Sequence, residues 1–224
     1  MTSWTGRGWW LVFLLWTAPA RAGDPPETPA SRDPEGIPCR QDRDLVRSFQ
    51  EVRTLRASFI DRREVDLLSE PLTSRGHLYY QRPDRLHYAL ESPGRQEVIV
   101  VGSQVRVHEP DLGRSQSLDL GASVIARAVV TSLIQVLGGR LDRLEAEYRC
   151  RSLRMAEGWE VRLVPQGPPL DRVVRGIEVR IARDGSLREV LVREATGDSS
   201  RMTLENVQVN VPFSPEEEQA DFTP

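Results

Sequence analysis

The first feature of the chain is a segment in which apolar residues recur at helical spacing. Between about Asp44 and Phe59 these positions alternate with arginine and glutamate. A single apolar stripe on a charged background predicts an amphipathic helix over residues 44–59 with one buried face. The residues of this stripe are Leu45, Phe49, Val52, Leu55 and Phe59.

The pattern then changes to the two-residue period of β-strands. Residues 76–82 and 85–90 flank Pro83-Asp84, which predicts a hairpin around a Pro-Asp turn. Within the second of these strands, Leu86, Tyr88 and Leu90 fall on one face. Residues 97–101 and 104–108, joined by Gly102-Ser103, predict a second hairpin.

Residues 122–137 interrupt the strands with a second helical pattern, which ends at Gly138-Gly139. A helix that is apolar nearly all round must be covered on several sides, or must itself cover something apolar. A short further helix is expected at residues 141–144. The face of the main helix consists of Ile125, Val129, Leu133 and Leu137, and Ala126, Val130 and Ile134 widen it.

The remainder of the chain predicts strands, with a tight turn at Asp184-Gly185. The sum is an α+β domain: one long antiparallel sheet, preceded by a helix and interrupted by inserted helices. A sheet of so many strands tends to curl, and the two helices are available to cover its concave face. The expected late strands are residues 159–163, 177–181, 187–194, 201–204 and 207–211.

The N-terminus has the order of a secretory signal peptide: Arg7, an apolar run over residues 9–16, and the small residues of Ala20-Arg21-Ala22. The apolar run is about half as long as a spanning helix requires, which disfavours a membrane anchor. We therefore expect a signal peptide at 1–22, cleaved near Ala22, and export to the periplasm. A proline-rich flexible leader (23–42), a domain (43–213) and a C-terminal tail (214–224) follow.

The net charge restricts the class of partner, and the two cysteines restrict the kinds of motif that they can form. The net charge of −3 becomes −5 when Arg7 and Arg21 leave with the signal peptide, and a mildly acidic chain without a basic patch argues against a nucleic-acid partner. Cys39 and Cys150 are too far apart for a C-x-x-C motif. Two alternatives stand: a structural disulfide, which would contribute about 4–5 kcal/mol in the loop-entropy description, or two unpaired buried thiols.

Catalytic motifs such as G-x-S-x-G, H-E-x-x-H and a glycine-rich phosphate loop are missing from the sequence. His77, His87 and His108 lie singly in strand-like segments, without carboxylates at metal-ligand spacing. Gly197-Asp198-Ser199 superficially suggests a serine hydrolase, but it lies between two strands with no histidine after it, so we interpret it as a turn. We expect no catalytic residues, no metal and no cofactor.

Several short motifs, in this order along residues 43–213, resemble the LolA-like family of outer-membrane lipoprotein carriers. The strand G-x-L-x-x-x-R-P and the order of all the motifs together carry the resemblance. The motifs are Leu55-Arg56-Ala57-Ser58-Phe59, residues 76–88, Ser92-Pro93 with 98–102, Leu163-Val164-Pro165, and Asp184-Gly185-Ser186-Leu187.

The resemblance implies an incomplete antiparallel β-barrel with an α-helical lid over a hydrophobic cavity. Arg82 matches the arginine that precedes the turn proline in this family. The resemblance implies that it acts as a polar latch, which reaches backbone groups of the lid in the closed form; the alternative is an ordinary exposed arginine. Leu86, Tyr88, Val98 and Val100 would line the cavity wall, with Ile125, Val129 and Leu133 as lid contacts, although the same residues could simply pack a closed core.

The resemblance also implies a function: a soluble, monomeric periplasmic carrier that binds an acylated lipoprotein or another envelope lipid. Such a carrier would take its cargo from an inner-membrane donor transporter to an outer-membrane acceptor. The alternative is a periplasmic sensor or regulatory domain of the same fold that binds a membrane-protein partner.

Overall fold

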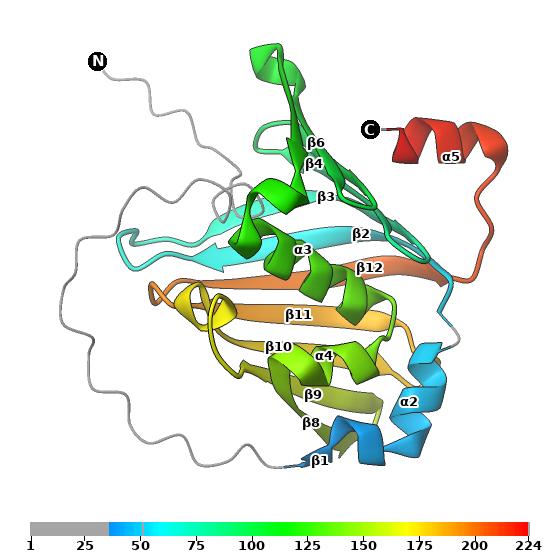
Figure 1. The fold of residues 1–224 in the computed structure, drawn as a ribbon. Helices are drawn as coiled ribbons and strands as arrows, with labels where there is room; N and C mark the ends of the chain where they lie inside the picture. Colours follow the sequence, from blue (N-terminus) through cyan, green and yellow to red (C-terminus); the bar gives the residue numbers. More distant parts are fainter. Residues whose placement is uncertain (1–35, 51, 224) are drawn as a thin grey trace.

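The computed structural model describes residues 36–50 and 52–223 (Figure 1). The expected signal peptide and most of the expected leader lie outside these residues. The described part is built around a twelve-stranded antiparallel sheet in the order β1-β8-β9-β10-β11-β12-β2-β3-β4-β5-β6-β7. The sheet curls without closing, and helices cover its concave side (Figure 1). This is the open, curled barrel with a helical lid that the sequence predicts.

The strands follow the chain in long meanders. β12 pairs with β2, and this pairing joins the strands before the inserted helices to those after them. The strands are β1 (Ile37–Pro38), β2 (Thr54–Glu64), β3 (Leu72–Gln81), β4 (Arg85–Ser92), β5 (Gln96–Val101), β6 (Gln104–Glu109), β7 (Arg114–Asp119), β8 (Tyr148–Met155), β9 (Gly158–Pro165), β10 (Val174–Ala182), β11 (Leu187–Glu194) and β12 (Ser199–Val209).

The helices occupy three places around the sheet. In Figure 1, α2 lies near the β8–β9 end of the sheet, α3 and α4 lie across its concave side, and α5 lies beyond the β4–β6 end. The α-helices are α2 (Arg43–Gln50), α3 (Val124–Leu137), α4 (Leu141–Glu147) and α5 (Pro215–Phe222), and the short 3₁₀ turns are η1 (Cys39–Gln41), η2 (Pro110–Leu112), η3 (Leu120–Ala122) and η4 (Leu170–Arg172).

The core lies between the concave face of the sheet and the helices α2, α3 and α4. In β2 the inward residues Leu55, Ala57 and Phe59 are buried, and in β4 Leu86, Tyr88 and Leu90 are buried. The rings of Phe59 and Tyr88 stack with centroids 4.8 Å apart. The two-residue period of these strands therefore directs their apolar side chains to one face, as the alternation predicts.

The expected helix over residues 44–59 is wrong in its second half. The helix α2 ends at Gln50, and Leu55 and Phe59 lie in β2. A spacing of four residues fits one turn of helix and two periods of a strand equally well, so these two positions could not distinguish the elements. The buried residue between them, Ala57, is the one that fits only the strand.

A disulfide bond joins Cys39 and Cys150, whose Cα atoms are 5.5 Å apart. It connects η1 to β8, and Ile37 pairs with Ser152 beside it. Residues 36–42 of the expected leader are thus part of the fold. At the other end of the chain, the expected C-terminal tail contains the helix α5.

Candidate functional site: an apolar cavity under a helical lid

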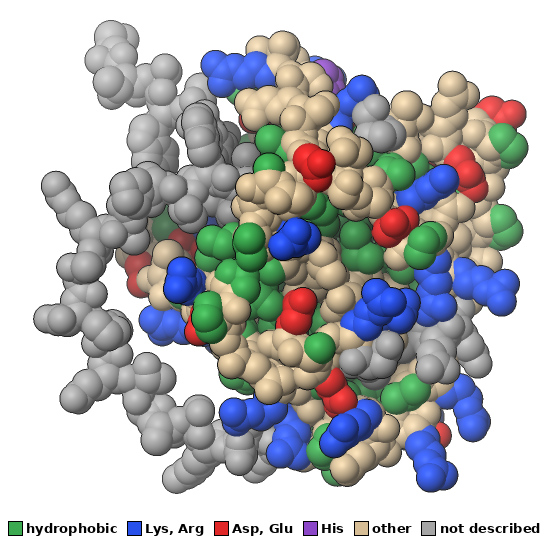
Figure 2. All heavy atoms as spheres, viewed as in Figure 1, with side chains coloured by type: hydrophobic (Ala, Val, Ile, Leu, Met, Phe, Trp, Pro, Cys, Tyr) green, Lys and Arg blue, Asp and Glu red, His purple; other side chains and the backbone are tan. Residues whose placement is uncertain are grey.

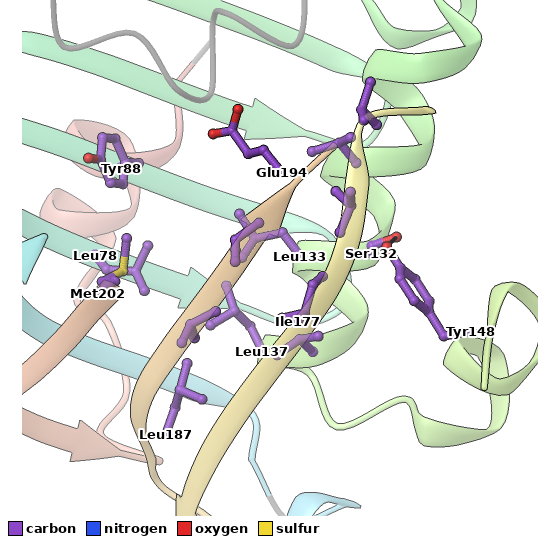
Figure 3. Close-up of a pocket in the computed structure, with 16 residues that line it drawn as sticks. Leu78, Tyr88, Ser132, Leu133, Leu137, Tyr148, Ile177, Leu187, Glu194 and Met202 are labelled. Atoms are coloured by element: carbon purple, nitrogen blue, oxygen red, sulfur yellow. Dashed lines mark hydrogen bonds between the residues drawn. The ribbon is translucent and has the colours of Figure 1, made fainter. Parts of the chain in front are cut away.

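A cavity of about 80 Å³ lies between α3 and the concave face of the sheet (Figure 3). The side chains that line it come from α3, from the strands β3, β4, β8, β10, β11 and β12, and from the segment just after η4. They are Leu78, Tyr88, Val129, Ser132, Leu133, Val136, Leu137, Tyr148, Val173, Val174, Ile177, Leu187, Val190, Val192, Glu194 and Met202. Nearly all are apolar, so the cavity offers contacts to hydrocarbon and few hydrogen-bonding groups.

The hydroxyl groups of Ser132 and Tyr148 are satisfied within the wall of this cavity. Tyr148 Oη donates to Ser132 Oγ at 3.0 Å, and Ser132 Oγ donates to the Ala128 carbonyl at 2.7 Å. Burial raises the pKa of Tyr148 to about 12, so its hydroxyl remains protonated at any ordinary pH. Because both groups have partners, the wall at this point behaves as an apolar surface.

A charged group marks one end of the cavity, where Glu194 lies beyond the apolar side chains (Figure 3). Its carboxylate is 3.0 Å from Arg63 Nη2, which is also 3.4 Å from Asp198. Burial raises the pKa of Glu194, and the nearby Arg63 acts in the opposite direction. The polar end of the cavity therefore lies where β2 and β11 end, at the ion pair between Arg63 and Glu194.

The cavity is not completely enclosed. Val129 and Leu133 on α3, together with Val173, Ile177 and Val192 opposite them, are only half-buried. On the face that carries α3, apolar side chains gather near the beginning of that helix (Figure 2), where Val124 is 57% exposed. The lid therefore contacts the sheet firmly at its C-terminal end and more loosely along its first turns.

The C-terminal end of the lid is held by Arg82, which lies in the turn between β3 and β4. Arg82 Nη2 donates to the Gly138 carbonyl at 2.6 Å. Tyr80, near the end of β3, is buried and hydrogen-bonds Arg82. A Cβ atom at Gly138 would collide with the Tyr80 hydroxyl, so the glycine allows the lid to approach this closely.

The structure brings some of the predicted site residues together at the cavity and places others elsewhere. Tyr88, Val129 and Leu133 line it. Leu86, Val98 and Val100 are buried in the adjoining core, and Ile125 is half-buried in the first turn of α3. A lipid-binding role for all seven stays a prediction, as does the action of Arg82 as a latch.

The sequence interpretation missed the part of the cavity wall formed by β10, β11 and β12. The alternation of Val190 and Val192 in β11 was a usable signal, because it places both side chains on the concave face. For Val173 no such signal exists, because it follows a 3₁₀ turn and its position depends on how that segment folds back.

The described residues also include the features that could indicate other classes of site. Ser199 is the first residue of β12 and pairs with Glu64 and Arg193 in the sheet. Among residues 36–50 and 52–223, no group of three or more His, Cys, Asp and Glu side chains is arranged to hold a metal ion. No helix within these ranges has both the length and the apolar character needed to cross a membrane.

Comparison with known proteins identifies the family. Residues 50–218, which include the sheet, the lid and the cavity, match the family model described as outer membrane lipoprotein carrier protein LolA. The chain belongs to the LolA family. This is a family of carrier proteins, and the match includes Arg82, Gly138 and every residue that lines the cavity.

Among curated relatives, the outer-membrane lipoprotein carrier protein of Chromohalobacter salexigens is 24% identical over 60% of this chain and 60% of its own. That of Alkalilimnicola ehrlichii is 27% identical over 77% of this chain and 75% of its own. The chain thus spans about 60% of the length of the first of these relatives. Among solved structures, the LolA superfamily protein NE2245 from Nitrosomonas europaea has a TM-score of 0.42 at 11% identity, covering 84% of this chain and 99% of its own.

Proposed function

We propose that this LolA-family protein is a periplasmic carrier that shields the acyl chains of a lipoprotein, or of another envelope lipid, beneath α3. The observation that carries the proposal is the apolar cavity between the sheet and a helix that a single arginine holds at one end. Membership of the family supports it. The signal-like N-terminus and the disulfide both fit an oxidising compartment outside the cytoplasm.

The free energy of hiding hydrocarbon from water is large enough for such a task. Each buried methylene contributes about 0.8 kcal/mol, so ten methylenes contribute about 8 kcal/mol. A protein that supplies this apolar environment can carry a lipid across an aqueous compartment. Release then requires an acceptor that offers the acyl chains an equal or better environment.

The size of the cavity implies that loading moves the lid. Pockets for small molecules usually measure about 300–1,000 Å³, whereas the cavity here has about 80 Å³. An acyl chain therefore enters only when α3 moves away from β10 and β11, which breaks the hydrogen bond between Arg82 and Gly138. In this proposal the structure corresponds to the closed form, and an inner-membrane donor and an outer-membrane acceptor act on the open form.

Native mass spectrometry of the protein, purified from the periplasm without detergent, tests the proposal. We expect an added mass that matches a lipid or an acylated peptide. The variant Val129→Glu puts a charge in the cavity wall and should lose this mass, because an unpaired carboxylate against acyl chains is strongly unfavourable.

Val124→Glu is the matched control, because it makes the same change on the same helix at an exposed position. It should retain the added mass. A carrier role is contradicted if the wild-type protein has only its own mass, and still has after incubation with phosphatidylethanolamine–phosphatidylglycerol vesicles. A stable complex with the periplasmic domain of a membrane protein, formed without lipid, would instead support the sensor alternative.

A further inference from the structure

The turn between β3 and β4 lies between the lid on its inner side and α5 on its outer side. On the inner side, Arg82 donates to the Gly138 carbonyl at the end of α3. The Arg82 backbone N–H donates to the Arg53 carbonyl at 2.9 Å. The position of this turn therefore decides whether the arginine can reach the lid.

On the outer side, the Glu218 carboxylate bridges the two residues that flank this turn: Gln81 at the end of β3 and Arg85 at the beginning of β4. Gln81 Nε2 donates to Glu218 Oε1 at 2.7 Å, and Arg85 Nη1 lies 3.3 Å from Glu218 Oε2. Arg85 Nη1 also donates to Gln81 Oε1 at 3.2 Å. Glu218, Gln81 and Arg85 thus form a closed triangle of polar contacts around the base of the turn.

The helix that carries Glu218 is itself attached to the outer face of the sheet. Arg56 makes two hydrogen bonds to Glu217, at 2.6 and 2.9 Å, and its guanidinium lies 4.1 Å from the centroid of the Phe213 ring. Phe213 and Phe222 pack edge to face with ring centroids 5.1 Å apart, and both are buried. These contacts hold α5 against the sheet, so the position of the Glu218 carboxylate is fixed relative to the sheet.

We propose that Glu218 is a positioning residue for the latch: α5 fixes the β3–β4 turn from outside and thereby keeps Arg82 in contact with the lid. This inference rests on the proposed function of α3 as a lid. The carboxylate does not touch the cavity and acts through Gln81 and Arg85. In this arrangement the C-terminal helix is part of the device that keeps the carrier closed.

The physical basis is the steep dependence of a hydrogen bond on distance and angle. A donor that moves from 2.6 Å to beyond about 3.5 Å no longer makes the bond. A displacement of the turn by about 1 Å is therefore enough to release Gly138. When Glu218 restrains the turn, the latch forms without first having to order these residues, and so loses less entropy.

The test is a double-mutant cycle on the full mature chain, measured by hydrogen exchange. The amides of Gly138, Gly139 and Arg140 are bonded to carbonyls of α3 itself, so their exchange reports how firmly the C-terminal end of the lid, where Arg82 binds, is held. We expect Glu218→Ala to accelerate it about fivefold, and Arg82→Ala at least as much, since the net loss of one such hydrogen bond is about 1 kcal/mol. In the Arg82→Ala background, Glu218→Ala should add nothing.

Glu216→Ala, an exposed position on the same helix, is the matched control and should leave the exchange of these amides unchanged. The inference is overturned if Glu218→Ala has no effect on them. It is equally overturned if Glu218→Ala has the same effect with and without Arg82, because α5 would then stabilise the molecule without acting through the latch.

The same variants separate this inference from the function on which it rests. If the effects of Glu218→Ala and Arg82→Ala on exchange are not additive, but the protein never acquires lipid, the coupling between these two residues is supported and the carrier role is contradicted. A wild-type protein that carries lipid, together with an unresponsive Glu218→Ala variant, would support the carrier role and overturn only the inference.

Discussion

Gly138 is a residue at which the end of α3, the β3–β4 turn and the sheet come close together. Its carbonyl accepts from Arg82, and a Cβ atom here would collide with the Tyr80 hydroxyl and lie 3.0 Å from the Ile134 carbonyl. Its φ of −83° is open to any residue. Close packing, and not backbone conformation, therefore explains the glycine.

Gly138→Ala should lower the free energy of unfolding by about 1–3 kcal/mol, the usual cost of adding an atom to a closely packed site. Tyr80→Phe in the same chain should recover part of this loss, because it removes the hydroxyl that the new methyl group meets first. Urea denaturation of the two single variants and the double variant measures both effects.

The control for this pair is Gly167→Ala, where a Cβ atom would meet nothing within 4 Å. It should change the free energy of unfolding little. A loss as large at Gly167 as at Gly138, or no recovery with Tyr80→Phe, would contradict the role of close packing.

Among the elements, α5 depends most clearly on ionised side chains. Glu217 accepts both hydrogen bonds from Arg56, and it also forms a capping box with Ser214 at the beginning of the helix. The hydrogen bonds from Arg56, followed by the one from the Ser214 backbone, lower the pKa of Glu217 to about 2. Glu218 and Asp221 on the same helix also face Arg85 and His87.

The sign of the pH dependence follows from this lowered pKa. An unfolded glutamate has a pKa of about 4.3, so the contribution of Glu217 to docking is complete above that pH and is lost as the pH falls towards 2. We expect the backbone NMR signals of α5 to shift towards undocked values between about pH 4 and pH 2. The signal of Ala220 is a suitable probe.

Glu217→Gln removes this titration and is the matched control. In that variant, the part of the transition that belongs to Glu217 should be absent at low pH, and α5 should already be less firmly docked at pH 6. Identical pH profiles for the two proteins would show that Glu217 does not control docking.

The elements also show what the sequence could and could not reveal. Both early hairpins and the lid helix follow directly from periodicity. The strand β7 was missed because Arg114-Ser-Gln-Ser-Leu-Asp119 has no alternation and is mostly exposed at the edge of the sheet. The helix α5 was missed although Ser214-Pro215 with Glu217 is a capping signal, since its charged residues gave no apolar stripe.

At the scale of the whole molecule, the apolar interior is well packed but not completely filled. Nearly every inward side chain belongs to one apolar cluster, yet a space of about 80 Å³ remains beneath the lid. Its existence was predicted through family resemblance. Its exact wall was not, because it depends on how β10 to β12 curl towards α3, which no local pattern encodes.

Filling this space with larger side chains should favour the closed form. The double variant Val129→Leu with Val192→Leu adds one methylene from each side of the cavity. We expect it to raise the free energy of unfolding of the lipid-free protein by about 0.5–2 kcal/mol and to weaken lipid binding, because the new contacts must be broken when α3 moves. Thermal denaturation and native mass spectrometry measure the two effects.

Val124→Leu adds the same group at an exposed position on α3 and should change neither quantity. Unchanged lipid binding in the double variant, despite a higher stability, would mean that lipid binds without displacing the lid.

The contact between Arg82 and Gly138 has a consequence for how such proteins diversify. The acceptor is a main-chain carbonyl, and every amino acid has one. The acceptor that the lid contributes to this hydrogen bond therefore does not depend on the side chains of α3. If the protein carries lipid as proposed, substitutions along that helix would reshape the compartment for a different hydrocarbon cargo and leave this hydrogen bond in place, so cargo selectivity and lid closure would evolve independently.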